Sequence, residues 1–339
     1  MTIAALPQPY LLFLGDVGER AFLKTALGLA DWASEHCIGE YRLPGAAVTT
    51  GLPAMAPVEA RAGGARAMVI GAATPGGGIP DSWIDGLLQA LGAGLDIVSG
   101  MHVPLSSIAR LAEAAERQGR QLIDVRRPPN SISVASGAKR TGNRLLTVGT
   151  DCALGKKYTA LAIDRAFRRR GIASDFRATG QTGILIAGRG MPMDAVVADF
   201  CAGAAEMLTP DAADDHWDVI EGQGSLFHPS YAGVSLALLH GSQPDVVVVC
   251  HEPGRRNMVG AAGFALPTVE EAIETNLLLA RRVNPQVRCA GVSFNTSALS
   301  VEDAERLMET EGARLGLPVA DPVRGGPAFD RLVSACLGQ

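Results

Sequence analysis

Short apolar runs rich in β-forming residues alternate with segments of helical periodicity along most of this 339-residue chain. Such alternation favours parallel sheets covered by helices, because parallel strands need a crossover connection. In the first third, the predicted strands are YLLFLGD, AAVTT, ARAMVIGA, LDIVSG and QLIDVR, at 10–16, 46–50, 65–72, 95–100 and 121–126. Later predicted strands are RLLTVG, ASDFRAT, WDVIEG, DVVVVC and VRCAGVSFN, at 144–149, 173–179, 217–222, 245–250 and 287–295. The sequence therefore predicts two doubly wound α/β sheets.

A polar stretch with two adjacent prolines, RRPPNSISVASGAKRTGNR at 126–144, separates the two series of strands. Its low apolar content is typical of a connection between compact units. The 47% of hydrophobic residues supplies enough side chains for two cores. We therefore expect one domain over residues 1–130 and a second over residues 131–339.

The charge of the chain disfavours nucleic-acid binding and favours a small-molecule substrate. The formal net charge is -5, and Lys and Arg occur in twos and threes, without a long basic run. The apolar run near the N-terminus stops at Gly15 and Asp16, far short of a membrane span. We expect no membrane partner.

Six cysteines lie far apart without a CxxC pair, which predicts no metal site and no disulfide scaffold. Reduced thiols fit a cytoplasmic protein. Homo-oligomers are common among cytosolic enzymes, so we expect one here.

The segment GTDCALGKKYTA at 149–160 has the order strand, glycine-bounded loop, lysine and helix that a phosphate-binding loop requires. Its glycines let the backbone form an anion-binding concavity, and the lysine adds positive charge beside a helix N-terminus. A plain βα turn is the alternative, because the chain contains 40 glycines. The predicted phosphate-binding residues are Gly149, Thr150, Asp151, Cys152, Gly155, Lys156, Lys157 and Tyr158.

This loop departs from the usual form in two respects. Five residues separate Gly149 from Gly155 where four are usual, and Lys157 occupies the position of the Ser or Thr that binds magnesium. Thr159 comes two residues later. The missing hydroxyl favours a ligand whose phosphates are not transferred, such as coenzyme A. Magnesium-dependent ATP chemistry remains the alternative.

Polar residues also follow three other predicted strands, where ligands bind in such sheets. Glu221 directly follows one strand and could accept a proton, hold magnesium or cap a helix. His228 is a second candidate base. For His251 a structural role is the alternative, because a lone His is more often structural than catalytic. The predicted substrate-binding residues are Arg177, Gln181, Thr182, Gly183, Ser225, His251 and Arg255. For the glycine-rich part of that set, an ordinary turn into a buried segment is the alternative.

Several motifs together resemble the D-glutamate N-acetyltransferase family, a two-domain phosphate-loop family formerly classed as a domain of unknown function. The resemblance covers nearly the whole chain. Its carriers are LFLGD, KTALGLADW, CIGEYRLP, LDIVSGMH, GTDCALGKKYTA, FRATGQTGILIAG, VVADFCAGAAE, EGQGSLFHPSYAGVSLALLHG and CHEPGR. One departure is Lys157, where the family pattern leads us to expect a methionine.

The resemblance implies a Rossmann-like N-terminal domain and a P-loop C-terminal domain. It also implies transfer of an acetyl group from acetyl-CoA to D-glutamate, giving N-acetyl-D-glutamate in D-amino acid catabolism. The loop GTDCALGK alone is similar to that of dethiobiotin synthetase, an ATP-dependent enzyme. The alternative is therefore a Mg-ATP-dependent kinase or ligase acting on a small carboxylate, and a non-catalytic coenzyme sensor is a third possibility.

Amide formation from a thioester needs a base and hydrogen-bond donors for the oxyanion. Glu221 or His228 is the expected base, and backbone N–H groups near Gly222 or Gly183 are the expected oxyanion donors. The candidate cations for the acceptor carboxylates are Arg177, Arg255, Lys139 and Arg140.

Overall fold

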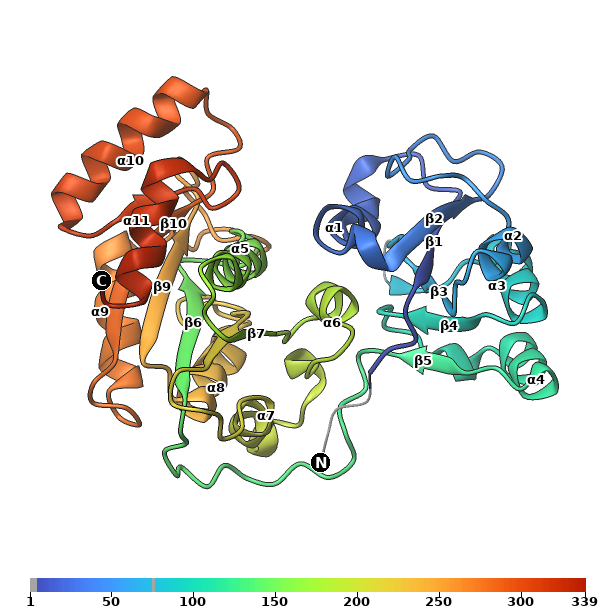
Figure 1. Ribbon diagram of the computed structural model, residues 1–339, viewed down its shortest axis with the longest axis horizontal. Coiled ribbons are helices and arrows are strands. Elements are labelled where there is room, and N and C mark those ends of the chain that lie inside the picture. The colour runs from blue at the N-terminus through green and yellow to red at the C-terminus, as the bar shows by residue number, and fades with distance from the viewer. Residues whose placement is uncertain (1–4, 75–76) are drawn as a thin grey trace. The chain divides into compact units, whose positions relative to one another are not determined.

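The computed structural model describes residues 5–74 and 77–339, which form two compact α/β units (Figure 1). The first unit runs to Pro128 and also contains residues Gly180–Ala195. The second contains Pro129–Thr179 and Val196–Gln339. The expected division at residue 130 assumed two continuous domains, whereas the structure adds a later segment to the first unit.

Five parallel strands form the sheet of the first unit, in the order β2-β1-β3-β4-β5. The strands are β1 (Tyr10–Gly15), β2 (Cys37–Arg42), β3 (Ala67–Ile70), β4 (Asp96–Ser99) and β5 (Leu122–Asp124). The helices are α1 (Lys24–Trp32), α2 (Pro57–Ala62), α3 (Asp81–Gly92), α4 (Ala109–Gln118) and α6 (Gln181–Ala187). Helices α1 and α6 lie on one face of this sheet, and α2, α3 and α4 lie on the other (Figure 1).

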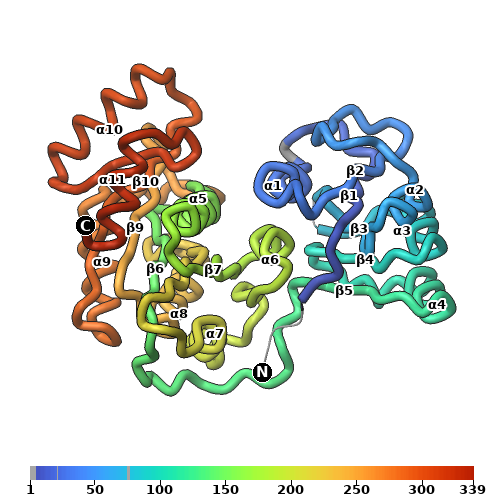
Figure 2. The backbone as a smooth tube through the Cα atoms, in the orientation of Figure 1, coloured from blue at the N-terminus to red at the C-terminus, as the bar shows by residue number. Residues whose placement is uncertain are grey.

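Helix α6 joins the first unit although it follows β7, a strand of the second unit, in sequence. It packs against α1, where the Thr25 and Thr182 hydroxyl oxygens are 3.2 Å apart. The Tyr10 hydroxyl donates to the Leu185 carbonyl oxygen at 3.3 Å. Figure 2 follows the chain by colour from β7 through α6 to α7.

One predicted strand of the first unit, at 46–50, is wrong. That segment is a loop, because the hydroxyls of Thr49 and Thr50 donate to the carboxylate of Glu40, which is fully buried. The strand at this place is β2, whose sequence CIGEYR lacks the apolar alternation by which strands are recognised. Glu40 therefore occupies a buried position of β2 at which an apolar residue is usual.

Six parallel strands form the sheet of the second unit, in the order β11-β10-β9-β6-β8-β7. The strands are β6 (Asn143–Gly149), β7 (Ser174–Arg177), β8 (Trp217–Ile220), β9 (Val246–His251), β10 (Arg288–Phe294) and β11 (Val319–Ala320). The helices are α5 (Lys156–Arg169), α7 (Cys201–Leu208), α8 (Ala232–Ser242), α9 (Val269–Ala280), α10 (Val301–Leu315) and α11 (Gly326–Cys336).

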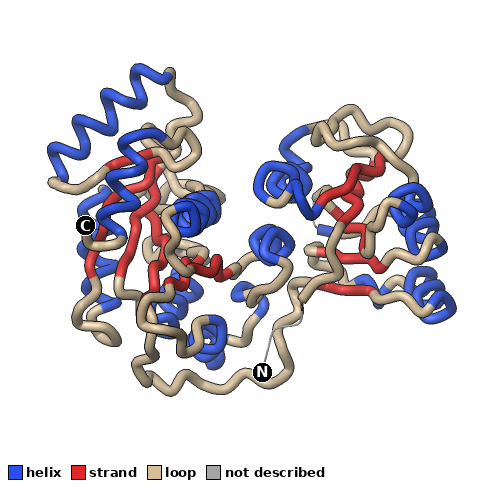
Figure 3. Tube along the Cα trace, viewed as in Figure 1, coloured by secondary structure: helices blue, strands red, loops and turns tan. Residues whose placement is uncertain are grey.

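Helices α5 and α11 pack on one face of the second sheet, and α8 and α9 pack on the other, with α7 against α8 (Figures 1 and 3). Strand β6 lies centrally, and Leu145, Leu146 and Val148 are buried. The expected pair of parallel α/β sheets is thus confirmed. Within the described residues, no helix has the length and apolar content needed to cross a membrane.

Close packing of α8 against α7 depends on Gly241. A Cβ atom at this position would lie 2.0 Å from the Ala202 carbonyl oxygen. We expect Gly241→Ala to lower the free energy of unfolding by about 1–3 kcal/mol, because the helices must separate. Gly233→Ala in the same helix is the control, since its Cβ would meet nothing within 4 Å, and it should be neutral or stabilising. Urea unfolding of both variants measures the difference, and equal stabilities would refute the packing argument.

Candidate functional site

The loop between β6 and α5 has the backbone conformation that its glycines predict. Gly155, directly before α5, has φ +106°, a left-handed value that favours glycine. A Cβ at Gly149 would lie 2.9 Å from the Cys250 carbonyl oxygen, so a side chain there would push the loop away from β9. Ala153 also adopts a positive φ of 53°. The expected order of strand, loop, Lys156 and helix is therefore present.

Lys156 is buried at the start of α5, with 6% of its surface exposed. Its Nζ donates to the Asp151 carbonyl oxygen at 2.7 Å, across the loop. Burial lowers the pKa of Lys156, because it disfavours the charged form of the amine. A bound phosphate would favour that charged form. The neighbouring Lys157 instead places its Nζ 4.5 Å from the centre of the Tyr158 ring.

Arg255 holds the loop from the β9 side. Its Nη1 donates to the Asp151 carboxylate at 3.1 Å and to the Cys152 carbonyl oxygen at 2.8 Å, and its Nη2 donates to the Ala153 carbonyl oxygen at 3.3 Å. The fully buried Asp151 carboxylate also accepts from the Val259 N–H at 2.8 Å. These contacts give Arg255 a role in shaping the loop. Its predicted role as an anchor for the substrate stays a prediction.

Thr150 and His251 join the loop to the end of β9. The Thr150 hydroxyl oxygen lies 3.0 Å from His251 Nδ1, and the Thr150 N–H donates to the Cys250 carbonyl oxygen at 3.1 Å. Burial is the main cause that lowers the pKa of His251, which favours the neutral ring. The half-buried Cys152 is not an activated thiol, because burial raises its pKa.

Glu221 lies beside the loop on the β8 side and is 4% exposed. Its Oε2 accepts from the Thr179 N–H at 2.9 Å, and the Thr179 hydroxyl donates to the Glu221 carbonyl oxygen at 2.7 Å. The next residue, Gly222, is packed so closely that a Cβ would lie 1.7 Å from the Thr147 carbonyl oxygen and 3.0 Å from Lys156 Cδ. Strand β8 therefore delivers a buried carboxylate next to the phosphate loop.

The Gly222 N–H donates to the Thr147 hydroxyl at 2.9 Å. That hydroxyl also lies 3.2 Å from the Lys156 carbonyl oxygen and 3.3 Å from the Ile220 carbonyl oxygen. The Gly222 N–H itself is therefore already hydrogen-bonded to β6, and the expected oxyanion donors near Gly222 or Gly183 stay a prediction.

His228 is 2% exposed, and both of its ring nitrogens have hydrogen-bond partners. Nδ1 accepts from the Ser230 N–H at 3.1 Å, so Nε2, 2.9 Å from the Val259 carbonyl oxygen, carries the proton. A general base needs an available lone pair, and this geometry leaves neither nitrogen open. The fully buried Ser225 has its hydroxyl 3.3 Å from the Phe227 N–H, within the same turn.

Arg177 ends β7, but its guanidinium folds back towards the beginning of β8. Its Nε donates to the Asp218 carboxylate at 2.7 Å, and its Nη2 lies 3.3 Å from the Asp175 carboxylate. The Glu221 N–H donates to the Arg177 carbonyl oxygen at 3.0 Å. The backbone of Arg177 therefore helps to position Glu221. The Arg177 guanidinium pairs with Asp218 and Asp175.

The other two candidate cations are also engaged with protein groups. Lys139 Nζ donates to the Asp245 carboxylate at 2.7 Å. Arg140, with 9% exposed, donates to the Thr209 carbonyl oxygen at 2.6 Å and to the Gly241 carbonyl oxygen at 2.7 Å. Lys139 thus forms an ion pair, and Arg140 binds backbone carbonyl oxygens at the C-terminal ends of α7 and α8.

Gln181, Thr182 and Gly183 belong to the first unit, in the first turn of α6. Their predicted role in substrate binding stays a prediction.

The side chains of Asp151, Cys152 and His228 place one potential metal-ligand atom each within 4.8 Å of one another. The Asp151 carboxylate already accepts from Arg255 and Val259, and the His228 nitrogens are bonded as described. A metal ion would have to displace these hydrogen bonds.

Sequence reasoning missed Thr147 and Thr179, which position Gly222 and Glu221. Thr147 interrupts the apolar run of β6, and a hydroxyl at a fully buried strand position is the signal that could have identified it. Thr179 carried no such signal, because it lies in a polar turn.

The fold and the site define a two-domain α/β protein with a P-loop. Residues 133–333 match the family model described as "Domain of unknown function (DUF1611_C) P-loop domain", and residues 42–128 match "Domain of unknown function (DUF1611_N) Rossmann-like domain". The chain belongs to this DUF1611 family. The expected Rossmann-like and P-loop domains are confirmed.

Two relatives match nearly the whole chain. A "D-glutamate N-acetyltransferase" of Tritonibacter scottomollicae is 50% identical over 330 residues, covering 97% of this chain and 98% of the relative. A protein of the same name from Pseudoalteromonas sp is 46% identical over 321 residues, covering 95% and 97%. The crystal structure of a DUF1611 family protein from Anabaena variabilis is similar with a TM-score of 0.84 and 33% identity, covering 98% and 100%.

Removing Arg255 should destabilise the phosphate loop. Arg255→Ala leaves the buried Asp151 carboxylate without its cation, which we expect to lower the free energy of unfolding by about 3 kcal/mol. Amide hydrogen exchange in residues 150–155 should also accelerate. Arg256→Ala, at an exposed neighbouring position, is the control and should change neither quantity. An unchanged loop in the Arg255 variant would contradict the clamping role.

Proposed function

We propose that this protein is a D-glutamate N-acetyltransferase that uses acetyl-CoA as donor and releases N-acetyl-D-glutamate and coenzyme A. The observation that carries the proposal is the match, at 50% and 46% identity over nearly the full length, to two proteins of that name. An acetyltransferase needs an acetyl donor, and the phosphate loop of the second unit supports a phosphate-bearing one. The six free cysteines are compatible with a cytoplasmic enzyme.

The residues of the loop favour phosphates that are held without being transferred. The position after Lys156 is a lysine, and Thr159 is the first Ser or Thr beyond it in sequence. The Thr159 hydroxyl is buried, 2.7 Å from the Ser293 hydroxyl between α5 and β10. The Thr159 hydroxyl therefore has a structural role in the core. In a P-loop ATPase, the hydroxyl of the Ser or Thr directly after the lysine binds magnesium instead.

Glu221 is the proposed general base. The neutral amine of D-glutamate attacks the thioester carbonyl carbon and forms the C–N bond, Glu221 takes the proton that nitrogen loses, and the C–S bond breaks. The departing thiolate is then protonated to give the thiol of coenzyme A. Support comes from the burial of Glu221, from the Thr179 hydrogen bonds that fix it, and from the close approach of the next residue, Gly222, to Lys156. The bonded ring nitrogens of His228 favour Glu221 over His228.

The proposal is tested with the wild-type protein and Lys156→Ala. Wild type should release thiol from acetyl-CoA when D-glutamate is added, without magnesium or ATP. Lys156→Ala should raise the KM for acetyl-CoA about ten- to a hundredfold, because a charged hydrogen bond to phosphate contributes about 1.5–3 kcal/mol. The KM for D-glutamate should stay unchanged, and Lys157→Ala should have the smaller effect. Release of ADP from Mg-ATP, with acetyl-CoA left intact, would instead establish a kinase or ligase.

Replacing the proposed base should remove turnover without weakening the binding of either substrate. We expect Glu221→Gln to lower kcat about a hundred- to ten-thousandfold. It should also abolish the acidic limb of the pH profile, which is the fall in kcat at low pH. Gln keeps a side-chain oxygen that can accept from the Thr179 N–H. His228→Gln serves as the comparison and should lower stability while keeping that limb. Loss of the acidic limb in the His228 variant alone would transfer the role of base to His228.

A further inference from the structure

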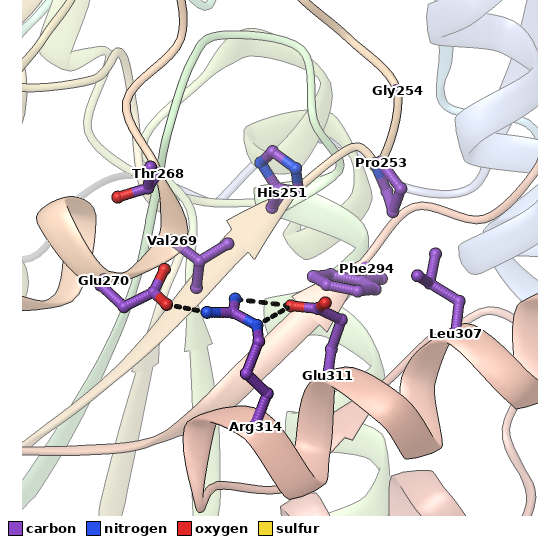
Figure 4. Close-up of a pocket in the computed structure, with 10 residues that line it drawn as sticks. All are labelled: His251, Pro253, Gly254, Thr268, Val269, Glu270, Phe294, Leu307, Glu311 and Arg314. Carbon is purple, nitrogen blue, oxygen red and sulfur yellow. Dashed lines mark hydrogen bonds and ion pairs between the residues drawn. The ribbon is translucent and has the colours of Figure 1, made fainter.

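A pocket of about 580 Å³ lies beyond the ends of β9 and β10 in the second unit (Figure 4). Its volume is within the range of small-molecule sites and exceeds what a single amino acid fills. His251 and Pro253 line it from the end of β9, Phe294 from the end of β10, and Leu307 from α10. The proposed function does not yet use this pocket.

One side of the pocket is apolar and aromatic. Phe294 is buried, and its ring centroid is 5.7 Å from that of His251. In Figure 4 Leu307 lies near Phe294, and Val269 adds an apolar side chain next to Glu270. The lowered pKa of His251 favours its neutral ring, so a flat uncharged group can pack here without facing a cation.

The lining also carries one cation and two carboxylates, and Figure 4 shows the Glu311 carboxylate beside the Phe294 ring. Arg314 donates to Glu270, and its Nε and Nη2 donate to Glu311 at 3.0 and 2.6 Å (Figure 4). The Arg314 guanidinium thus pairs with two carboxylates. Because two negative charges face one positive charge, this cluster has an excess of negative charge. A dicarboxylate or a phosphate would be repelled, whereas a neutral group with N–H donors would find acceptors.

The pocket lies on the β9 side of the phosphate loop. Strand β9 lies between β10 and β6, and the hydrogen bond between Thr150 and His251 joins the loop to the pocket edge. Glu221 follows β8, on the opposite side of β6. A ligand whose phosphates bind the loop can therefore extend one end into the pocket and the other towards Glu221.

We propose that the pocket binds the adenine base of coenzyme A, which packs against Phe294 and donates from its amino group to the neighbouring carboxylates. The pyrophosphate then lies on the loop at Lys156, and the acetyl end points towards β8. This inference rests on the proposed function, and it assigns D-glutamate to a place outside the pocket. A purine base is neutral, flat and rich in hydrogen-bonding groups, as the lining requires.

The test fills the pocket with Leu307→Trp and compares two donors. S-acetyl-4′-phosphopantetheine lacks the adenosine part of acetyl-CoA but keeps the thioester and one phosphate. We expect the variant to raise the KM for acetyl-CoA at least about tenfold, as a steric mismatch in a ligand pocket does. The KM values for S-acetyl-4′-phosphopantetheine and for D-glutamate should stay at their wild-type levels. Val301→Trp, at a 53% exposed position on the same helix, is the control and should behave as wild type.

The outcomes separate this inference from the proposed function. If wild type transfers no acetyl group, the proposed function fails. If wild type transfers it and Leu307→Trp uses acetyl-CoA as well as wild type does, only the pocket assignment fails. A rise in the KM for D-glutamate would overturn the assignment by placing the acceptor in the pocket.

Hydrogen exchange of the wild-type protein covers the case of a Leu307→Trp variant that does not fold. Adenosine 3′,5′-bisphosphate should protect amides in residues 268–280 and 301–315, and D-glutamate should not. Protection by Mg-ATP but not by the bisphosphate would assign the pocket to a nucleoside triphosphate and overturn the inference.

Discussion

The Thr147 hydroxyl holds together the three elements on which the site depends. It accepts the Gly222 N–H and lies within hydrogen-bond distance of the carbonyl oxygens of Lys156 and Ile220. One buried side chain in β6 thus joins the start of α5 to the end of β8. Since a single Cβ atom at Gly222 would not fit beside Thr147, the approach of Glu221 to the phosphate loop requires this packing.

Parallel strand direction explains why residues distant in sequence meet at this edge of the second sheet. All six strands point the same way, so the segments after β6, β8 and β9 converge where the strands end. The loop is then fixed from two sides, by Gly222 from β8 and by Arg255 from beyond β9. Preorganisation of this kind suits the proposed binding of phosphate, because the loop would lose little further conformational entropy.

The fold and the phosphate loop could be predicted from the sequence because their signals are local. Apolar runs, glycine spacing and a lysine before a helix are all properties of short segments. The roles of the charged side chains could not be predicted in this way. Arg177 was expected to face a ligand because it ends a strand, yet its guanidinium pairs with Asp218, a residue that is adjacent only through the pairing of β7 with β8.

The position of α6 could not be predicted for a similar reason. A helix after a strand normally covers the same sheet, and nothing in the segment QTGILIA indicates that α1 is its partner. Strand β2 was missed because its buried Glu40 is recognisable only once Thr49 and Thr50 are in contact with it.

The insertion of residues 180–195 into the first unit also has a consequence during protein synthesis. The ribosome makes most of that unit first, then β6, α5 and β7 of the other, and only then the segment that covers α1. The first unit therefore cannot complete its core while it emerges alone. The surface of α1 that α6 covers therefore stays exposed until more than fifty further residues have been translated.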